Sequence, residues 1–308
     1  MTGDQPQAGT EIEQFVMQQT LFGAHSHIMT VPMWAETGPH FRSLIGYAGS
    51  DLECAAGPTV IGKWPVPTTN DEDYKERYFE LWRASRFTGY CRATELACRD
   101  LLGVEYREEN AEAIGQGIAR LVGDDPAASY REVLRGRANI RWLIKDSVRS
   151  PEETRDELYP SDFVRFNYRD DELLSIRSRA DVVRREQWWG RSVHSVGDLV
   201  DGLNGSISSC LETGKITCFK IGLPYERSLA FTEPTLHEAE KAFSRLMNVT
   251  PGVTLEPSSA GAGVLRMSRC SAEELRPLQD YLVHRYVRRA EAEGLPVQVH
   301  TGYLACLL

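Results

Sequence analysis

The chain has 308 residues, of which 42% are hydrophobic and 26% charged, a balance typical of a globular protein rather than a disordered one. Its net charge of −9 argues against nucleic acid as a general partner, because phosphate binding requires clustered lysines and arginines. It shows no signal-peptide pattern and no apolar run near the roughly twenty residues of a membrane span. The seven cysteines are scattered without a CxxC pair, which favours reduced thiols. We therefore expect a cytoplasmic protein without a membrane partner.

The first informative stretch is residues 20–28, which reads as a short apolar strand ending in two histidines. Side chains alternate along a strand, so His25 and His27 share one face and Phe22 lies on the other. Two imidazoles on one face are suitable ligands for a divalent metal, although such a pair also occurs as two partly exposed histidines. Before this strand, residues 1–18 form an N-terminal segment in which residues 12–17 are predicted to be helical.

Residues 29–69 are rich in glycine, proline and aromatic residues and show little periodicity. Such a long connection fits a lid or binding loop, and it fits equally a surface excursion packed by its own aromatic side chains. Within it, Trp34 is a candidate substrate-binding residue. Apolar stripes at helical spacing then predict a helical insertion over about residues 71–137.

Two further strands are predicted at residues 139–145 and 163–168. Asp146 and Arg165 lie at or near the ends of these strands. Either residue could bind a substrate carboxylate or orient water, whereas a structural ion pair is the commoner role and the one that we favour. We retain Arg165 as a second candidate substrate-binding residue.

The remainder of the chain alternates helices and strands. Residues 195–214 form a well-delimited helix, which Ser195 caps and Gly214 ends, and it leads into a strand at residues 216–222 that carries Lys220. Helices are expected at residues 234–246 and 271–293, the latter regular only from near Leu275 because of Pro277. A last strand spans residues 297–300 and ends in His300.

Three of these strands present a ligand-type residue at their carboxyl ends, which converge on one mouth in a parallel α/β barrel. His25-Ser26-His27, Lys220 and His300-Thr301-Gly302 resemble the first, fourth and fifth strand ends of the amidohydrolase superfamily of metal-dependent (β/α)8 barrels. Residues 41–51 and 89–103 resemble the amidohydrolase-related branch that includes uronate-isomerase-like proteins. Gly23 departs from the family, which often has an acidic residue there.

This resemblance implies a site that binds a divalent metal, Zn or Mn. Its ligands would be His25, His27, His300 and, if carbamylated, Lys220. It also implies a small molecule as the partner, and homo-oligomer formation is left open. Of these residues, Lys220 is the candidate for a direct catalytic role.

Only five strands are predicted, whereas a closed barrel of this type has eight. We therefore expect an incomplete TIM-type (β/α) barrel over residues 19–308, truncated after its fifth strand. The later family ligands, a histidine after the sixth strand and an aspartate after the eighth, have no counterpart.

The function expected from the resemblance is hydrolysis of a C–N or C–O bond in a small molecule by metal-activated water, with activity in doubt at this length. One alternative is a uronate-isomerase-like interconversion of sugar acids, which consumes no water. Another is a fragment without catalysis.

Overall fold

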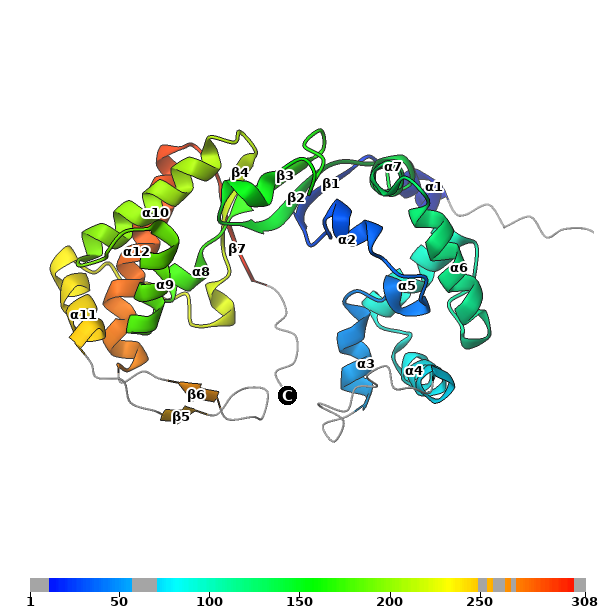
Figure 1. Cartoon of the computed structure of the whole chain (residues 1–308), viewed down its shortest axis with the longest axis horizontal. Helices are drawn as coiled ribbons and strands as arrows, with labels where there is room; N and C mark the ends of the chain where they lie inside the picture. The colour runs from blue at the N-terminus through cyan, green and yellow to red at the C-terminus, as the bar shows by residue number, and fades with distance from the viewer. Residues whose placement is uncertain (1–10, 57–70, 249–253, 257–263, 267–269, 302–308) are drawn as a thin grey trace, which may run out of the picture.

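The computed structural model describes residues 11–56, 71–248, 254–256, 264–266 and 270–301. Its main sheet has five parallel strands in the order β1-β2-β3-β4-β7. The sheet curls into part of a barrel, with helices arranged around it (Figure 1). The fold is thus an incomplete α/β barrel, as the sequence predicts. The strands are β1 (Leu21–Ser26), β2 (Ile140–Val148), β3 (Val164–Tyr168), β4 (Ile216–Ile221) and β7 (Val297–Val299).

All five predicted strands are present, with ends that differ by a few residues. The largest difference is in β2, which continues to Val148 and so includes Asp146. The curl of the sheet is evident from its two edges. Gln298 on β7 donates a hydrogen bond of 2.8 Å to the backbone oxygen of Ala24 on β1, which joins the first and last strands of the sheet order.

The segment between β1 and β2 forms one lobe of the molecule, which we call the insertion lobe (Figure 1). Its core is a cluster of buried aromatic rings, among which the Trp82 and Tyr106 ring centroids lie 4.4 Å apart. The helices of the lobe are α2 (Val31–Ala35), η1 (Phe41–Leu44), α3 (Ala48–Ala56), α4 (Asp71–Ser85), α5 (Gly89–Ala97), η3 (Cys98–Leu102), η4 (Glu108–Asn110), α6 (Ala111–Val122), α7 (Pro126–Arg131) and η5 (Glu132–Arg137).

The helical prediction for residues 71–137 is therefore confirmed, and α1 (Glu11–Met17) confirms the short N-terminal helix. Residues 31–56 differ from expectation, because they contain α2, η1 and α3 instead of an irregular loop. These helices are four to nine residues long, too short to show a clear apolar period. The rest of that segment, residues 57–70, lies outside the described residues.

The other lobe, which we call the C-terminal lobe, packs against β3 and β4 (Figure 1). Tyr286 anchors it, because its buried hydroxyl donates to the backbone oxygen of Tyr168 on β3 at 2.6 Å and lies 3.1 Å from that of Lys220 on β4. Its helices are α8 (Asp171–Leu174), α9 (Arg179–Trp189), α10 (Val196–Leu211), α11 (Leu236–Asn248) and α12 (Ala272–Ala292).

Capping explains where two of these helices begin. Ser195 caps α10 by accepting a hydrogen bond of 3.1 Å from the backbone N–H of Asp198. Ser271 and Glu274 form a capping box at α12, which begins at Ala272 and continues through Pro277. The expectation of regular helix only from Leu275 was therefore wrong, because the capping box stabilises the first turn and offsets the backbone hydrogen bond that proline cannot make.

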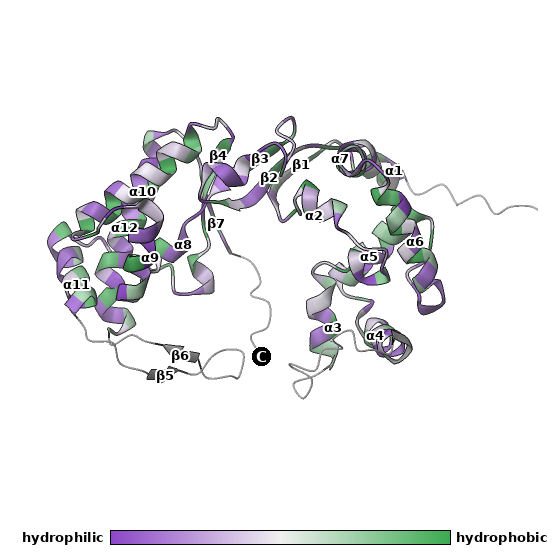
Figure 2. Cartoon of the chain, in the orientation of Figure 1, coloured by the Kyte–Doolittle hydropathy of each residue, from purple (hydrophilic) through white to green (hydrophobic). Residues whose placement is uncertain are grey.

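The helices α8 and α9 were not expected from the sequence, and neither was the antiparallel pairing of β5 (Thr254–Glu256) with β6 (Val264–Arg266). None of the described helices combines the length and apolar character that crossing a membrane requires. Hydrophilic residues recur among the hydrophobic ones along α10, α11 and α12 (Figure 2).

Two glycines of α10 give opposite predictions for stability. A Cβ at Gly202 would lie 2.4 Å from Cε3 of Trp189, whose ring is held by a 2.9 Å hydrogen bond from Nε1 to Ser206. Gly202→Ala should therefore destabilise the protein by about 1–3 kcal/mol through overpacking. A Cβ at Gly205 meets no atom within 4 Å. Gly205→Ala should stabilise the protein by about 0.5–1 kcal/mol, because alanine is the better helix former. Urea unfolding of both variants measures the difference, and equal shifts would contradict it.

Candidate metal centre

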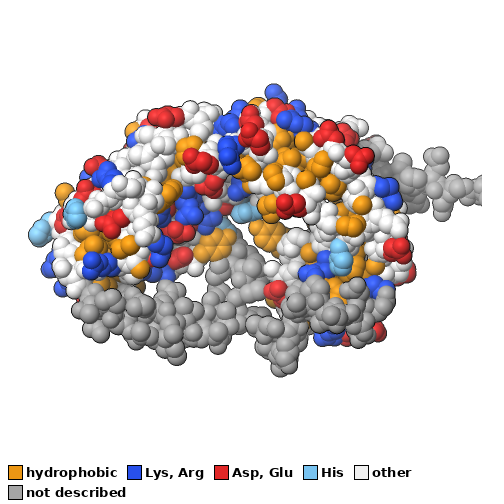
Figure 3. Space-filling view, viewed as in Figure 1, with side chains coloured by type: hydrophobic (Ala, Val, Ile, Leu, Met, Phe, Trp, Pro, Cys, Tyr) orange, Lys and Arg blue, Asp and Glu red, His pale blue; other side chains and the backbone are white. Residues whose placement is uncertain are grey.

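Each strand of the main sheet brings a polar side chain to its carboxyl end. In the space-filling view the two lobes stand apart below the strands and leave a hollow between them (Figure 3). The strand-end residues are His25 on β1 with His27 just beyond it, Asp146 on β2, Asn167 on β3, Lys220 on β4 and His300 just beyond β7. Convergence at the carboxyl ends of the strands is the arrangement in which barrel proteins build their sites.

His25, His27 and Asp146 form a group with the geometry of a metal site. The two Nε2 atoms lie 2.9 Å apart, and Oδ2 of Asp146 lies 3.8 Å from Nε2 of His25 and 3.9 Å from Nε2 of His27. All three ligand atoms are within 4.8 Å of one another, and no other such group of three or more donors occurs in the described ranges. In a tetrahedral zinc site, ligands at 2.0–2.1 Å lie about 3.3 Å apart, so the three donors fit one ion.

The two histidines are the pair that strand alternation predicts to share one face. Their ring centroids are 4.8 Å apart, and both side chains are partly exposed. The pKa of His25 is lowered by its burial and by the positive charge of Lys220. A lowered pKa keeps the imidazole neutral near pH 7, which is the form that binds a metal.

Asp146 is held as a carboxylate by its neighbours. It is 5% exposed and accepts hydrogen bonds from Asn167 at 2.7 Å and from Arg169 at 3.0 Å. Burial alone would raise its pKa, but the bond from Asn167 and the charges of Arg169 and Lys220 outweigh it and lower the pKa. The expected structural ion pair is thus present, with Arg169. The same Oδ2 atom also faces the histidines, which the sequence reading did not anticipate.

Lys220 lies in the wall of this site with only 3% of its surface exposed. Burial has the largest effect and lowers the pKa of Lys220. The charge of Asp146 raises this pKa, whereas the charge of Arg169 lowers it further. A buried lysine of this kind has a larger fraction of neutral amine than an exposed one.

His300 approaches the site from the opposite edge of the sheet. Its ring stacks on Tyr225 with centroids 4.1 Å apart, and Nδ1 lies 3.2 Å from the Tyr225 hydroxyl. Its Nε2 atom is buried and has no hydrogen-bond partner within the described part of the chain. Burial and the charges of Lys220 and Arg169 lower the pKa of His300, so its ring shares the electrostatic environment of Lys220. It lies outside the close group of three.

The two candidate substrate-binding residues occupy different environments. Arg165 donates to the backbone oxygen of Val164 at 3.0 Å and lies over the ring of Trp142 at 4.6 Å, so its guanidinium is engaged within the protein. Trp34 is 9% exposed, and its Nε1 donates to Ser129 at 2.9 Å. Trp34 lines a cavity together with His27, whereas Arg165 lies in neither the group of three nor that cavity.

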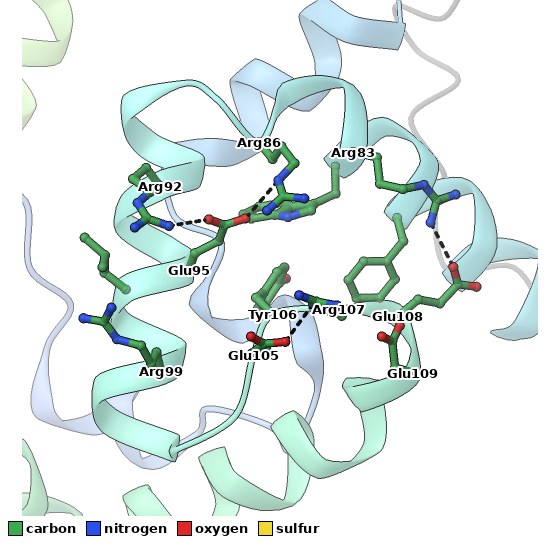
Figure 4. A pocket seen from close by; sticks show the side chains of 13 residues that line it. Arg83, Arg86, Arg92, Glu95, Arg99, Glu105, Tyr106, Arg107, Glu108 and Glu109 are labelled. Carbon is green, nitrogen blue, oxygen red and sulfur yellow. Dashed lines mark hydrogen bonds and ion pairs between the residues drawn. The ribbon is translucent and has the colours of Figure 1, made fainter. Parts of the chain in front are cut away.

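A larger cavity, of about 460 Å³, lies in the insertion lobe away from this centre. Its rim is charged, but the arginines pair with carboxylates, as for Arg92 with Glu95 at 3.0 Å and Arg83 with Glu108 at 3.2 Å (Figure 4). The opposite charges compensate one another within the rim. This cavity therefore offers no group of convergent metal ligands like that of His25, His27 and Asp146.

Comparison with known proteins adds little to this geometry. No protein-family model matches the chain, and no curated protein matches it. Among solved structures, the chain is similar to a "putative metal-dependent hydrolase" from Lactobacillus casei ATCC 334, with a TM-score of 0.47 and 17% sequence identity. The similarity covers 95% of this chain and 60% of that one, so the chain spans less than two thirds of that structure's length. Similarity of this degree carries no inference about chemistry, which rests on the side chains.

Proposed function

We propose that the chain is a metal-dependent hydrolase that cleaves a C–N or C–O bond of a small molecule. The observation that carries this proposal is the convergence of two histidine nitrogens and one carboxylate oxygen within 4.8 Å. A divalent ion bound there, for which we propose Zn or Mn, would supply Lewis-acid activation of water and polarisation of a carbonyl group. The amidohydrolase-related resemblance of the strand ends agrees with this function.

The residues around the centre have distinct roles in this proposal. His25, His27 and Asp146 hold the ion, and Arg169 and Asn167 keep the carboxylate of Asp146 ionised and oriented. Side chains that hydrogen-bond a metal ligand in this way fix the direction of that ligand.

We propose His300 as a further ligand, because its buried Nε2 atom has no partner among the described residues. We propose Lys220 as another ligand, once its neutral amine has added to CO₂ and lost a proton to give an anionic carbamate. The lowered pKa of Lys220 supports this reaction, since only the neutral amine combines with CO₂.

Tyr225 should act as a positioning residue for His300. If Nε2 binds the metal, Nδ1 must carry the proton, and this N–H then donates a hydrogen bond to the Tyr225 hydroxyl, 3.2 Å away. Tyr225→Phe retains the stacked ring and removes the acceptor, so we expect the metal affinity to fall about 10–100-fold. Competition with a chelating dye measures the affinity, and ¹⁵N NMR of the imidazole reports the tautomer. Tyr90→Phe, at a half-exposed tyrosine of α5, is the control. An unchanged affinity and tautomer would contradict this role.

An activity screen tests the reaction class. The purified chain, loaded with Zn or Mn, should hydrolyse members of a panel of amides, esters and lactones, and a chelator should abolish the activity. Product analysis in H₂¹⁸O detects the incorporation of water that hydrolysis requires. Conversion of a uronate to a keto acid without ¹⁸O incorporation would favour the isomerase alternative instead. No turnover by a chain that contains metal would indicate a binding protein.

A further inference from the structure

His27 belongs to a second feature besides the metal group. It lies on the wall of a cavity of about 230 Å³. The cavity is formed by the segment that follows β1, by α2, and by the helices α7 and η5 that precede β2. Its lining residues are His27, Ile28, Met29, Trp34, Tyr130, Val133 and Leu134.

Apart from His27, the wall of this cavity presents apolar surface, because its polar side-chain atoms already form hydrogen bonds elsewhere. The two aromatic residues that could present polar atoms use them elsewhere, since Nε1 of Trp34 donates to Ser129 at 2.9 Å and the hydroxyl of Tyr130 donates to the backbone oxygen of Met29 at 2.8 Å. Their rings pack edge to face, with centroids 6.4 Å apart. A polar ligand group in this cavity would lose its hydrogen bonds to water without finding replacements, which costs roughly 1–3 kcal/mol per group.

The size of the cavity indicates what it can hold. An apolar protein cavity of about 150 Å³ is large enough to bind benzene. A volume of about 230 Å³ therefore accommodates a phenyl ring or a branched alkyl group of similar size.

From these observations we propose that the cavity is a substrate subsite, which binds an apolar aryl or branched alkyl group next to the bond that is cleaved at His25 and His27. This inference rests on the proposed function, and it narrows the substrate class to small amides or esters with an apolar substituent. A sugar acid, which carries a hydroxyl group on nearly every carbon, fits this wall poorly. The cavity thus favours the hydrolase over the uronate-isomerase alternative.

The decisive experiment follows the methionine methyl groups by NMR. Met29 lines the cavity, whereas Met33 is 57% exposed on α2 and does not. The protein is labelled with [methyl-¹³C]methionine, and the variant Met29→Leu assigns the methyl signal of Met29. Added benzamide should shift the methyl signal of Met29 until binding saturates, and it should leave the methyl signal of Met33 unchanged. Acetamide, which lacks the aryl group, should bind at least 10-fold more weakly. A shift of Met33 as large as that of Met29, or no shift of Met29, would overturn the assignment, and so would saturation by glucuronate at the same concentration.

A variant and a metal titration complete the test. Val133→Phe should fill the cavity and weaken benzamide binding at least 10-fold, whereas Val183→Phe, on the exposed face of α9, should not. If Val133→Phe does not fold, the wild-type shifts still decide the question. Added Mn²⁺ should broaden the aryl proton signals of bound benzamide, because the cavity and the metal group share His27. If a sample shown to contain bound Mn²⁺ gives no broadening, the subsite is excluded. Benzamide binding is also measured without metal, and metal content is measured separately, so failure of the metal centre and failure of the subsite give different results.

Discussion

The variant His25→Ala should lose nearly all of its bound metal. A four-ligand zinc site gains about 10–16 kcal/mol from the ion, or roughly 3 kcal/mol per ligand. Loss of one imidazole should therefore weaken binding about 100-fold or more, at 1.4 kcal/mol per factor of ten. His27→Ala should behave in the same way, because its Nε2 atom lies 2.9 Å from that of His25. Elemental analysis after dialysis against a weak chelator measures the metal retained per chain.

The control for this experiment is His237→Ala. His237 is exposed in the first turn of α11, in the C-terminal lobe, and belongs to no group of ligands in the described residues. It should retain as much metal as the wild type. If His25→Ala and His27→Ala retain the metal as well, the ion is bound elsewhere and the candidate centre is wrong.

The second large effect concerns stability, and it arises from an ion pair inside the C-terminal lobe. Arg185 on α9 donates two hydrogen bonds to Asp170, at 2.6 and 3.1 Å, and the two residues are 4% and 0% exposed. Asp170 also caps α8 by accepting from the backbone N–H of Leu173 at 3.3 Å. Arg185→Met would leave a buried carboxylate without its counter-charge, and we expect a loss of about 3–5 kcal/mol in the free energy of unfolding.

A neighbouring arginine provides the matched control for this prediction. Arg184, the preceding residue, forms an exposed ion pair with Asp181, and Arg184→Ala should change the stability by less than about 1 kcal/mol. The double variant Arg185→Met/Asp170→Asn should recover part of the loss, since it removes the unpaired charge. Urea unfolding followed by circular dichroism compares the variants. A loss of under 1 kcal/mol for Arg185→Met would show that Asp170 is solvated or protonated in the folded protein.

The parts of this structure that follow a simple period were predictable from the sequence. Alternation along a strand placed His25 and His27 together, and the placement of ligand-type residues at strand ends anticipated that Lys220 would lie in the same wall. The curled parallel sheet followed from strands that alternate with helices. Each of these inferences depends on local geometry that the residue types themselves determine.

The remaining features depend on contacts between distant segments. Asn167 on β3 and Arg169 just after it orient Asp146, and both lie more than twenty positions further along the chain. The sequence therefore indicated an ion pair for Asp146, but not that its carboxylate also faces the two histidines. A usable signal existed, since Asp146 follows Trp142 and Ile144 on one face of a strand and so points to the inner side. Trp34 lies in the five-residue helix α2, which is too short for an apolar period to indicate the direction of its side chains.

The open edge of the sheet has a consequence for how the protein behaves at high concentration. Among the described strands, β1 pairs with β2 alone, and its Leu21 and Phe22 side chains are 50% and 61% exposed. Residues 11–28 contain no lysine or arginine, the residues that commonly protect such an edge. An incoming polypeptide in extended conformation would find main-chain groups that no second strand pairs with and exposed apolar side chains there, so β1 is where aggregation should nucleate.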